Sequence, residues 1–169
     1  MPDALPPAAL LPWIEDPGSL TEQMRAVCGD DFKLTLLGRR YYRPLTSEAR
    51  LLALPPRRYA FIREALLGCG GVPWIFARSV LPLPALRGSN RRIAHLGERP
   101  LGDILFSDSN LYRCAVRISP LRTQCPLYRI CERALGRDPA GSWLRQSLFQ
   151  IHKELVLVSE VFLSETRTE

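Results

Sequence analysis

Two segments of β-type sequence joined by a glycine-rich stretch constrain the fold of this chain most. Residues 58–67 (RYAFIREALL) and 74–81 (WIFARSVL) are separated by residues 68–73, GCGGVP. Glycines at such a connection supply the backbone conformations that a hairpin turn requires. The sequence therefore predicts two neighbouring antiparallel strands here.

Further segments extend the β pattern, and helical signals lie between them. In residues 111–118 the side chains alternate cleanly, so that Arg113 and Arg117 share one face. Ser19 and Glu22 fit a capping box that opens a helix. We expect strands at 32–43, 58–67, 74–81, 111–118, 143–151 and 154–163, and helices at 20–27, 89–96, 100–106 and 126–135. Strands with interspersed helices predict an α+β fold with an antiparallel sheet, in a single domain over residues 1–169.

The N-terminal segment and the cysteines bear on the compartment. Residues 1–18 are proline-rich, contain no Lys or Arg, and are interpreted as an extended arm rather than a signal or transit peptide. No stretch approaches the roughly 20 apolar residues that span a bilayer. We expect a cytoplasmic protein without membrane insertion, whose cysteines are free and mostly buried thiols. The cysteines are Cys28, Cys69, Cys114, Cys125 and Cys131.

The formal net charge of +6 leaves two classes of partner open. A basic nucleic-acid-binding domain is one, with a faint hint at residues 39–43, where Arg39, Arg40 and Arg43 flank two tyrosines. However, the arginines are spread along the chain, and such a surface also attracts a small dianion. With only His95 and His152, and without a P-loop or a nucleophile elbow, the sequence predicts no metal, no nucleotide site and no nucleic-acid partner.

Two charged residues lie where the strand pattern predicts an apolar face. Arg78 alternates with apolar residues in the segment 74–81, and Glu160 does so in 154–163. A charge in such a place needs a partner, because desolvation costs on the order of several kcal/mol per ion. Either the two side chains pair with each other or with backbone groups, or they form the polar ends of an apolar pocket. The second reading suits a flat ring with a carboxylate at one end and a hydroxyl at the other.

Five motifs in fixed order carry a resemblance to a known family. They are residues 61–67 with Pro73 and Trp74, then ARSVLP at 77–82, LGERPLGDILF at 96–106, AGSWLRQS at 140–147 and EVFL at 160–163. In this order they resemble the chorismate–pyruvate lyases of ubiquinone biosynthesis. The resemblance implies a six-stranded antiparallel sheet whose small ligand is enclosed under helical flaps. It also implies conversion of chorismate to 4-hydroxybenzoate and pyruvate, without cofactor or metal.

The resemblance assigns roles to individual residues. Arg78 matches the family arginine that holds the ring carboxylate, and Glu160 matches the glutamate near the 4-hydroxyl; both are expected to be catalytic as well as substrate-binding. Leu101 matches the pocket-lining leucine of the PLG motif. Leu20, or alternatively Met24, matches the apolar pocket residue of the first helix.

Chorismate carries a second carboxylate, on its enolpyruvyl group, and Arg145 is a candidate cation for it; a surface strand position is the alternative for this arginine. Two features depart from the family pattern: the longer connection 119–138, expected to be a helical insertion, and Ser164 in place of proline. We expect a monomer. The competing hypothesis is a non-catalytic effector-binding module of the same fold, as in the ligand domains of some bacterial transcription regulators.

Overall fold

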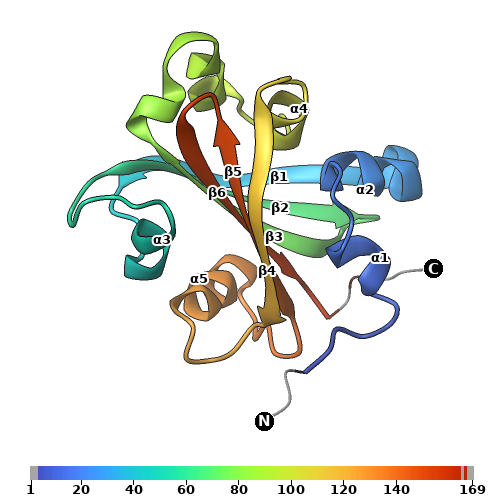
Figure 1. Ribbon diagram of the computed structural model, residues 1–169. Coiled ribbons are helices and arrows are strands. Elements are labelled where there is room, and N and C mark those ends of the chain that lie inside the picture. Colours follow the sequence, from blue (N-terminus) through green and yellow to red (C-terminus); the bar gives the residue numbers. More distant parts are fainter. Residues whose placement is uncertain (1–3, 165, 167–169) are drawn as a thin grey trace.

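The computed structural model describes residues 4–164 and 166, and its strands form one six-stranded antiparallel sheet in the order β1-β2-β3-β6-β5-β4. β1–β3 run nearly crosswise to β4 and β5 because the sheet is strongly twisted (Figure 1). The strands are β1 (Phe32–Tyr42), β2 (Ala60–Cys69), β3 (Val72–Pro82), β4 (Leu111–Pro120), β5 (Trp143–Ile151) and β6 (Glu154–Phe162). All six predicted strands and the antiparallel sheet are confirmed.

The helices are short and lie in the connections. They are α1 (Leu11–Ile14), α2 (Leu20–Cys28), α3 (Thr46–Leu51), α4 (Leu101–Leu105) and α5 (Pro126–Leu135), with 3₁₀ turns η1 (Gly29–Asp31), η2 (Leu83–Leu86) and η3 (Gly88–His95). Three predicted helices correspond to α2, α4 and α5; the fourth, at 89–96, is the 3₁₀ segment η3. No helix within residues 4–164 is long and apolar enough to cross a bilayer.

The pairing of β2 with β3 sets the register of the sheet. Gly70 and Gly71 form the turn with φ angles of 59° and 81°, which confirms the predicted hairpin. Ala65 lies opposite Ala77, and Ala77 lies opposite Glu160 on β6. Directly opposed residues point to the same face, so these three define what we call the front face of the sheet.

Helices cover both faces. On the front face, α1 and α2 pack on one part of the sheet and η2, η3 and α4 on another, forming two apolar clusters. On the back face, α5 covers Phe76, Leu144 and Val161, and the residues after α3 cover Ile62, Val80 and Leu157. The sheet is therefore the middle of three layers.

The predicted extended arm is wrong for residues 10–14. Pro12 lies in the first turn of α1, where its missing N–H costs nothing. Trp13 is 4% exposed and packs edge-on against Trp74, with 5.7 Å between the ring centroids. The short run LLPWI buries its apolar side chains against the front face, which the proline content of the segment concealed.

The prediction of five free thiols does not hold in this structure. Cys28, at the end of α2, and Cys69, at the end of β2, form a disulfide with a Cα–Cα distance of 5.7 Å. They are 41 residues apart, so no short spacing motif announces the pair. Among the others, Cys131 is buried, Cys125 is partly exposed and Cys114 is exposed.

Candidate active site

A pocket lies between the front face of the sheet and the two helices α2 and α4. Its cavity volume is about 60 Å³, and all of the space between its lining atoms, open solvent at the mouth included, amounts to about 600 Å³. Its floor is open because Ala65, Ala77 and Ser79, at the centre, have small side chains. The wall also includes Ser19, Leu20, Leu34, Arg63, Leu101, Leu105, Arg113, Phe149, Val158 and Glu160.

Arg63 on β2 is the positive pole of the pocket. It is 5% exposed, and its Nη2 donates to the carbonyl oxygens of Gly97 at 3.0 Å and Arg99 at 2.7 Å. These acceptors are neutral, and no carboxylate of the described residues pairs with it. Burial lowers the pKa of Arg63, yet a guanidinium stays charged in proteins. The pocket therefore contains a buried positive charge that the described chain leaves without a counter-ion.

Glu160 on β6 is the negative pole. Its Oε2 accepts a hydrogen bond from Arg145 Nε at 2.6 Å. Arg63 lies opposite Ser79, two residues along β3 from the Ala77 that faces Glu160. With β3 between them, the backbones of Arg63 and Glu160 are about 10 Å apart perpendicular to the strands and about 7 Å apart along them, or about 12 Å in total. Two oppositely charged side chains thus border one apolar space from two sides.

Arg145 lies opposite Glu160 on β5 and supports its carboxylate. It is 1% exposed, and its Nη1 donates to the carbonyl oxygens of Trp13, Ile14 and Asp16 at 3.3, 3.2 and 3.0 Å. It does not line the pocket. The hypothesis that Arg145 meets a second substrate carboxylate is therefore wrong, because Arg145 does not line the pocket and its Nε and Nη1 are engaged by Glu160 and by the carbonyls of Trp13, Ile14 and Asp16; the alternative of a surface position is wrong too.

Two helix starts close the pocket. Leu20 and Leu101, the first residues of α2 and α4, both line it, whereas Met24 lies fully buried in the apolar core. The first amides of a helix lack intrahelical acceptors, so polar N–H groups lie at this edge. Of the two predicted candidates on α2, the structure therefore places Leu20 at the pocket.

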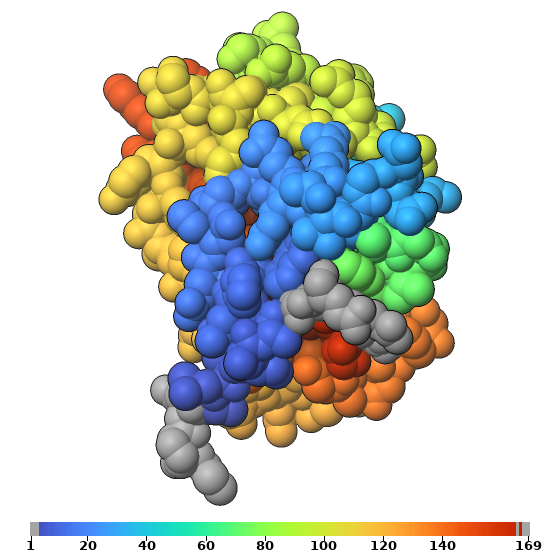
Figure 2. Space-filling model, turned by 90° about the vertical axis from the view of Figure 1, so that its right-hand side faces the viewer, coloured from blue at the N-terminus to red at the C-terminus, as the bar shows by residue number. Residues whose placement is uncertain are grey.

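The two flap helices approach each other closely. A Cβ on Gly102 would lie 3.2 Å from Ser19 Oγ and 3.3 Å from Thr21 Oγ1, so a larger residue would require these side chains to shift by a few tenths of an ångström. Arg25 on α2 binds Asp103 on α4 through two hydrogen bonds of 2.8 and 3.1 Å. Figure 2 shows the N-terminal segment in blue lying against the yellow α4 region over this face.

Sequence comparison decides the family. The family model described as "Chorismate lyase" matches residues 2–168. The chain belongs to the chorismate lyase family. A relative from Aromatoleum aromaticum named "Probable chorismate pyruvate-lyase" is 41% identical over 159 residues, which cover 93% of this chain and 85% of that protein. Another of the same name, from Methylococcus capsulatus, is 37% identical over 151 residues, covering 89% and 92%.

Solved structures share the fold of this chorismate lyase family member. The effector domain of PhnF from Mycobacterium smegmatis superposes with a TM-score of 0.57 at 16% identity, covering 88% of this chain and 90% of that one. A GntR-family transcriptional regulator from Bacillus cereus gives 0.57 at 10% identity, covering 80% and 94%. At such low identity the likeness concerns the fold alone.

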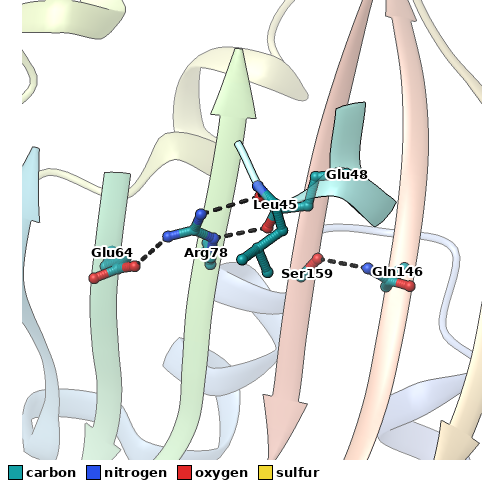
Figure 3. A network of polar contacts seen from close by, with 6 residues as sticks. All are labelled: Leu45, Glu48, Glu64, Arg78, Gln146 and Ser159. Carbon is teal, nitrogen blue, oxygen red and sulfur yellow. Dashed lines mark hydrogen bonds and ion pairs between the residues drawn. The ribbon is translucent and has the colours of Figure 1, made fainter. Parts of the chain in front are cut away.

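Arg78 lies elsewhere in this family member. Its guanidinium is on the back face, where Nε and Nη2 donate to Glu48 at 2.7 and 3.0 Å and Nη1 donates to Glu64 at 2.5 Å (Figure 3). Burial alone would lower its pKa, but the two carboxylates raise it overall. The expectation that Arg78 faces Glu160 across the pocket is wrong. Arg78 is opposite Ser159, the neighbour of Glu160, and adjacent strand residues point to opposite faces.

The sequence did contain a signal for Arg63. Arg63, like Arg78, alternates with apolar residues along its strand. Its neighbours on the same face are Phe61, Ala65 and Leu67, so Arg63 also lies on an apolar strand face. It lies within the first of the five family motifs. Its carbonyl partners, Gly97 and Arg99, belong to the third motif, so the two motifs meet in space at the positive pole.

Proposed function

We propose that this chain is a chorismate–pyruvate lyase that converts chorismate to 4-hydroxybenzoate and pyruvate. The observation that carries the proposal is the pair of opposite charges, Arg63 and Glu160, on one sheet face with a small apolar space between them. A 4-hydroxybenzoate ring carries an anion at one end and a hydroxyl at the other. Membership of the chorismate lyase family supports the same reaction.

Arg63, in place of Arg78, is assigned to the ring carboxylate. Its buried guanidinium lacks a counter-ion among the described residues, and a carboxylate would supply one through charge-assisted hydrogen bonds. Leu20 and Leu101 border the pocket and contribute apolar contact and free helix-start amides. Holding the carboxylate in this way fixes the orientation of the ring.

Glu160 is assigned to the C4 hydroxyl end. In the reaction the C4 hydrogen leaves as a proton, the C3–O bond breaks, and the enol of pyruvate departs and tautomerises. Glu160 contacts the hydroxyl and assists the proton transfer, while Arg145 holds its carboxylate in place. Because formation of the aromatic ring drives the elimination, no cofactor is required.

The test is direct. The purified protein is incubated with chorismate, and pyruvate is measured by a coupled lactate dehydrogenase assay while 4-hydroxybenzoate is measured by chromatography. Equal amounts of both products above the spontaneous rate are expected. Binding of 4-hydroxybenzoate without pyruvate release would identify an effector-binding module instead.

We further propose that the protein acts as a cytoplasmic monomer whose product enters ubiquinone synthesis. A reducing compartment would open the Cys28–Cys69 bond. Trapping thiols with iodoacetamide during lysis, followed by mass spectrometry, is expected to label both cysteines. Sedimentation of the purified protein is expected to give the mass of one 19.1 kDa chain.

A further inference from the structure

A third guanidinium of the front face has no assigned role. Arg113 on β4 lines the pocket and is half-buried. Its Nε is buried and lacks a hydrogen-bond partner among the residues that the structure describes. A buried donor of this kind is costly to leave unpaired, so it indicates a group that the described chain does not supply.

The surroundings of Arg113 hold it in one place. It lies opposite Phe149 on β5, and its guanidinium carbon is 4.8 Å from the centre of that ring. The register shifts directly after it, between Arg113 and Ala115, and such bulges redirect side chains at functional sites. Burial lowers the pKa of Arg113, as does repulsion from Arg145, while the carboxylates of Glu160 and Asp16 act in the opposite direction. The guanidinium of Arg113 is therefore close enough to the Glu160 carboxylate to interact with it electrostatically.

The strand order places Arg63 and Arg113, neither of which forms an ion pair with a described residue, on opposite sides of the pocket. Arg63 is on β2 and Arg113 is on β4, with β3, β6 and β5 between them. If the ring carboxylate is at Arg63, C4 is at Glu160, and the ether oxygen on the adjacent C3 is on the same side. The enolpyruvyl carboxylate then extends toward the β4 side of the pocket.

We propose that Arg113 binds the enolpyruvyl carboxylate of the substrate. This inference rests on the proposed lyase function and deepens it. The substrate has two carboxylates and the aromatic product has one, so Arg113 is a contact that only the substrate makes. It therefore supports substrate binding without strengthening product binding. Arg113, and not Arg145, is then the cation for the second carboxylate of the substrate.

The experiment compares Arg113→Met, Arg113→Lys and the control Arg117→Met, which removes an exposed arginine of the same strand. For each, kcat and KM with chorismate and the Kd of 4-hydroxybenzoate are measured. A charge-assisted contact is worth roughly 1.5–3 kcal/mol, so kcat/KM of Arg113→Met should fall about 10- to 100-fold. The Kd of 4-hydroxybenzoate should stay within about threefold, Arg113→Lys should recover part of the loss, and Arg117→Met should match the wild type.

Several outcomes would overturn the proposal. Unchanged kcat/KM in Arg113→Met is one, and equal losses in chorismate turnover and product binding are another, because they indicate a general structural role. Failure of both Arg113 variants to unfold cooperatively on heating would likewise make the residue structural. If the wild type itself releases no pyruvate, the lyase function fails, and this inference fails with it.

Discussion

The two faces of the sheet each bury an arginine on neighbouring strands, and the two arginines are satisfied in opposite ways. On the back face, Arg78 binds two carboxylates, one from α3 and one from β2. On the front face, Arg63 binds two backbone carbonyls. The charge of Arg78 is neutralised by carboxylates of the protein, whereas the site around Arg63 keeps a net positive charge. This difference teaches that the partners of a buried charge, more than its burial, distinguish a structural residue from a ligand-binding one.

The largest effect is expected on the back face. Arg78→Met leaves Glu48, which is 1% exposed, without its cation, and breaking such a pair costs about 3–5 kcal/mol of unfolding free energy. Denaturant titration measures the loss. The folded fraction should retain normal kcat, because the pocket is on the other face. The double variant Arg78→Met with Glu48→Met should regain part of the stability; a double variant less stable than Arg78→Met would contradict the structural role.

The matched change on the front face should affect activity instead. Arg63→Met removes a positive charge with only neutral acceptors, so its unfolding midpoint should change little or rise. Loss of the carboxylate contact should lower kcat/KM for chorismate about 10²- to 10³-fold and weaken 4-hydroxybenzoate binding. Calorimetry and kinetics on the same sample check both. Stability loss with near-normal turnover would reverse the comparison between the faces.

Glu160→Gln would leave Arg145 with neutral hydrogen-bond acceptors only, as Arg63 already has, and so it sharpens the comparison. With the charge removed, Arg145 keeps only the carbonyls of Trp13, Ile14 and Asp16 and a neutral amide. We expect kcat to fall about 10²-fold if Glu160 assists proton transfer. Single-turnover measurement of 4-hydroxybenzoate formation tests this. Unchanged kcat with a raised KM would make Glu160 a binding residue only.

The smallest effect concerns a thiol on the back face. Burial raises the pKa of Cys131 to about 12, so the folded thiol stays neutral when the unfolded one, near pKa 9.0, ionises. Stability contributed by this group is therefore present below about pH 9 and declines as pH rises above it. Iodoacetamide at pH 9 should modify exposed Cys114 long before Cys131, as peptide mass spectrometry would show. Equal rates would mean that α5 does not seal this face.

The sheet was predictable because its signals are local. Alternation and the GCGGVP turn identify β2 and β3, and the pairing follows from the short connection. α1 and α3 were missed because their stability comes from tertiary contacts: Trp13 packs on Trp74, and Glu48 binds Arg78. Neither contact leaves a periodic pattern in the sequence.

The site was predictable in part, and its error has a physical cause. Glu160, Leu20 and Leu101 do border the pocket, and their motifs pointed there. Alternation shows that Arg63 and Arg78 each lie on an apolar face, but it does not say which face the flap helices cover. That depends on register and on where α2 and α4 pack, both of which are non-local. The Cys28–Cys69 bond depends on the same packing.

The position of β6 has a consequence for how the molecule is made. β6 is the most C-terminal strand, yet it lies between β3 and β5. A chain still emerging from the ribosome therefore has two separate partial sheets, β1–β3 and β4–β5, each with an unpaired inner edge open to aggregation. Insertion of residues 154–162 joins them and delivers Glu160 in the same step. The step that pairs the two open strand edges, and so removes their tendency to aggregate, is therefore also the step that completes the active site.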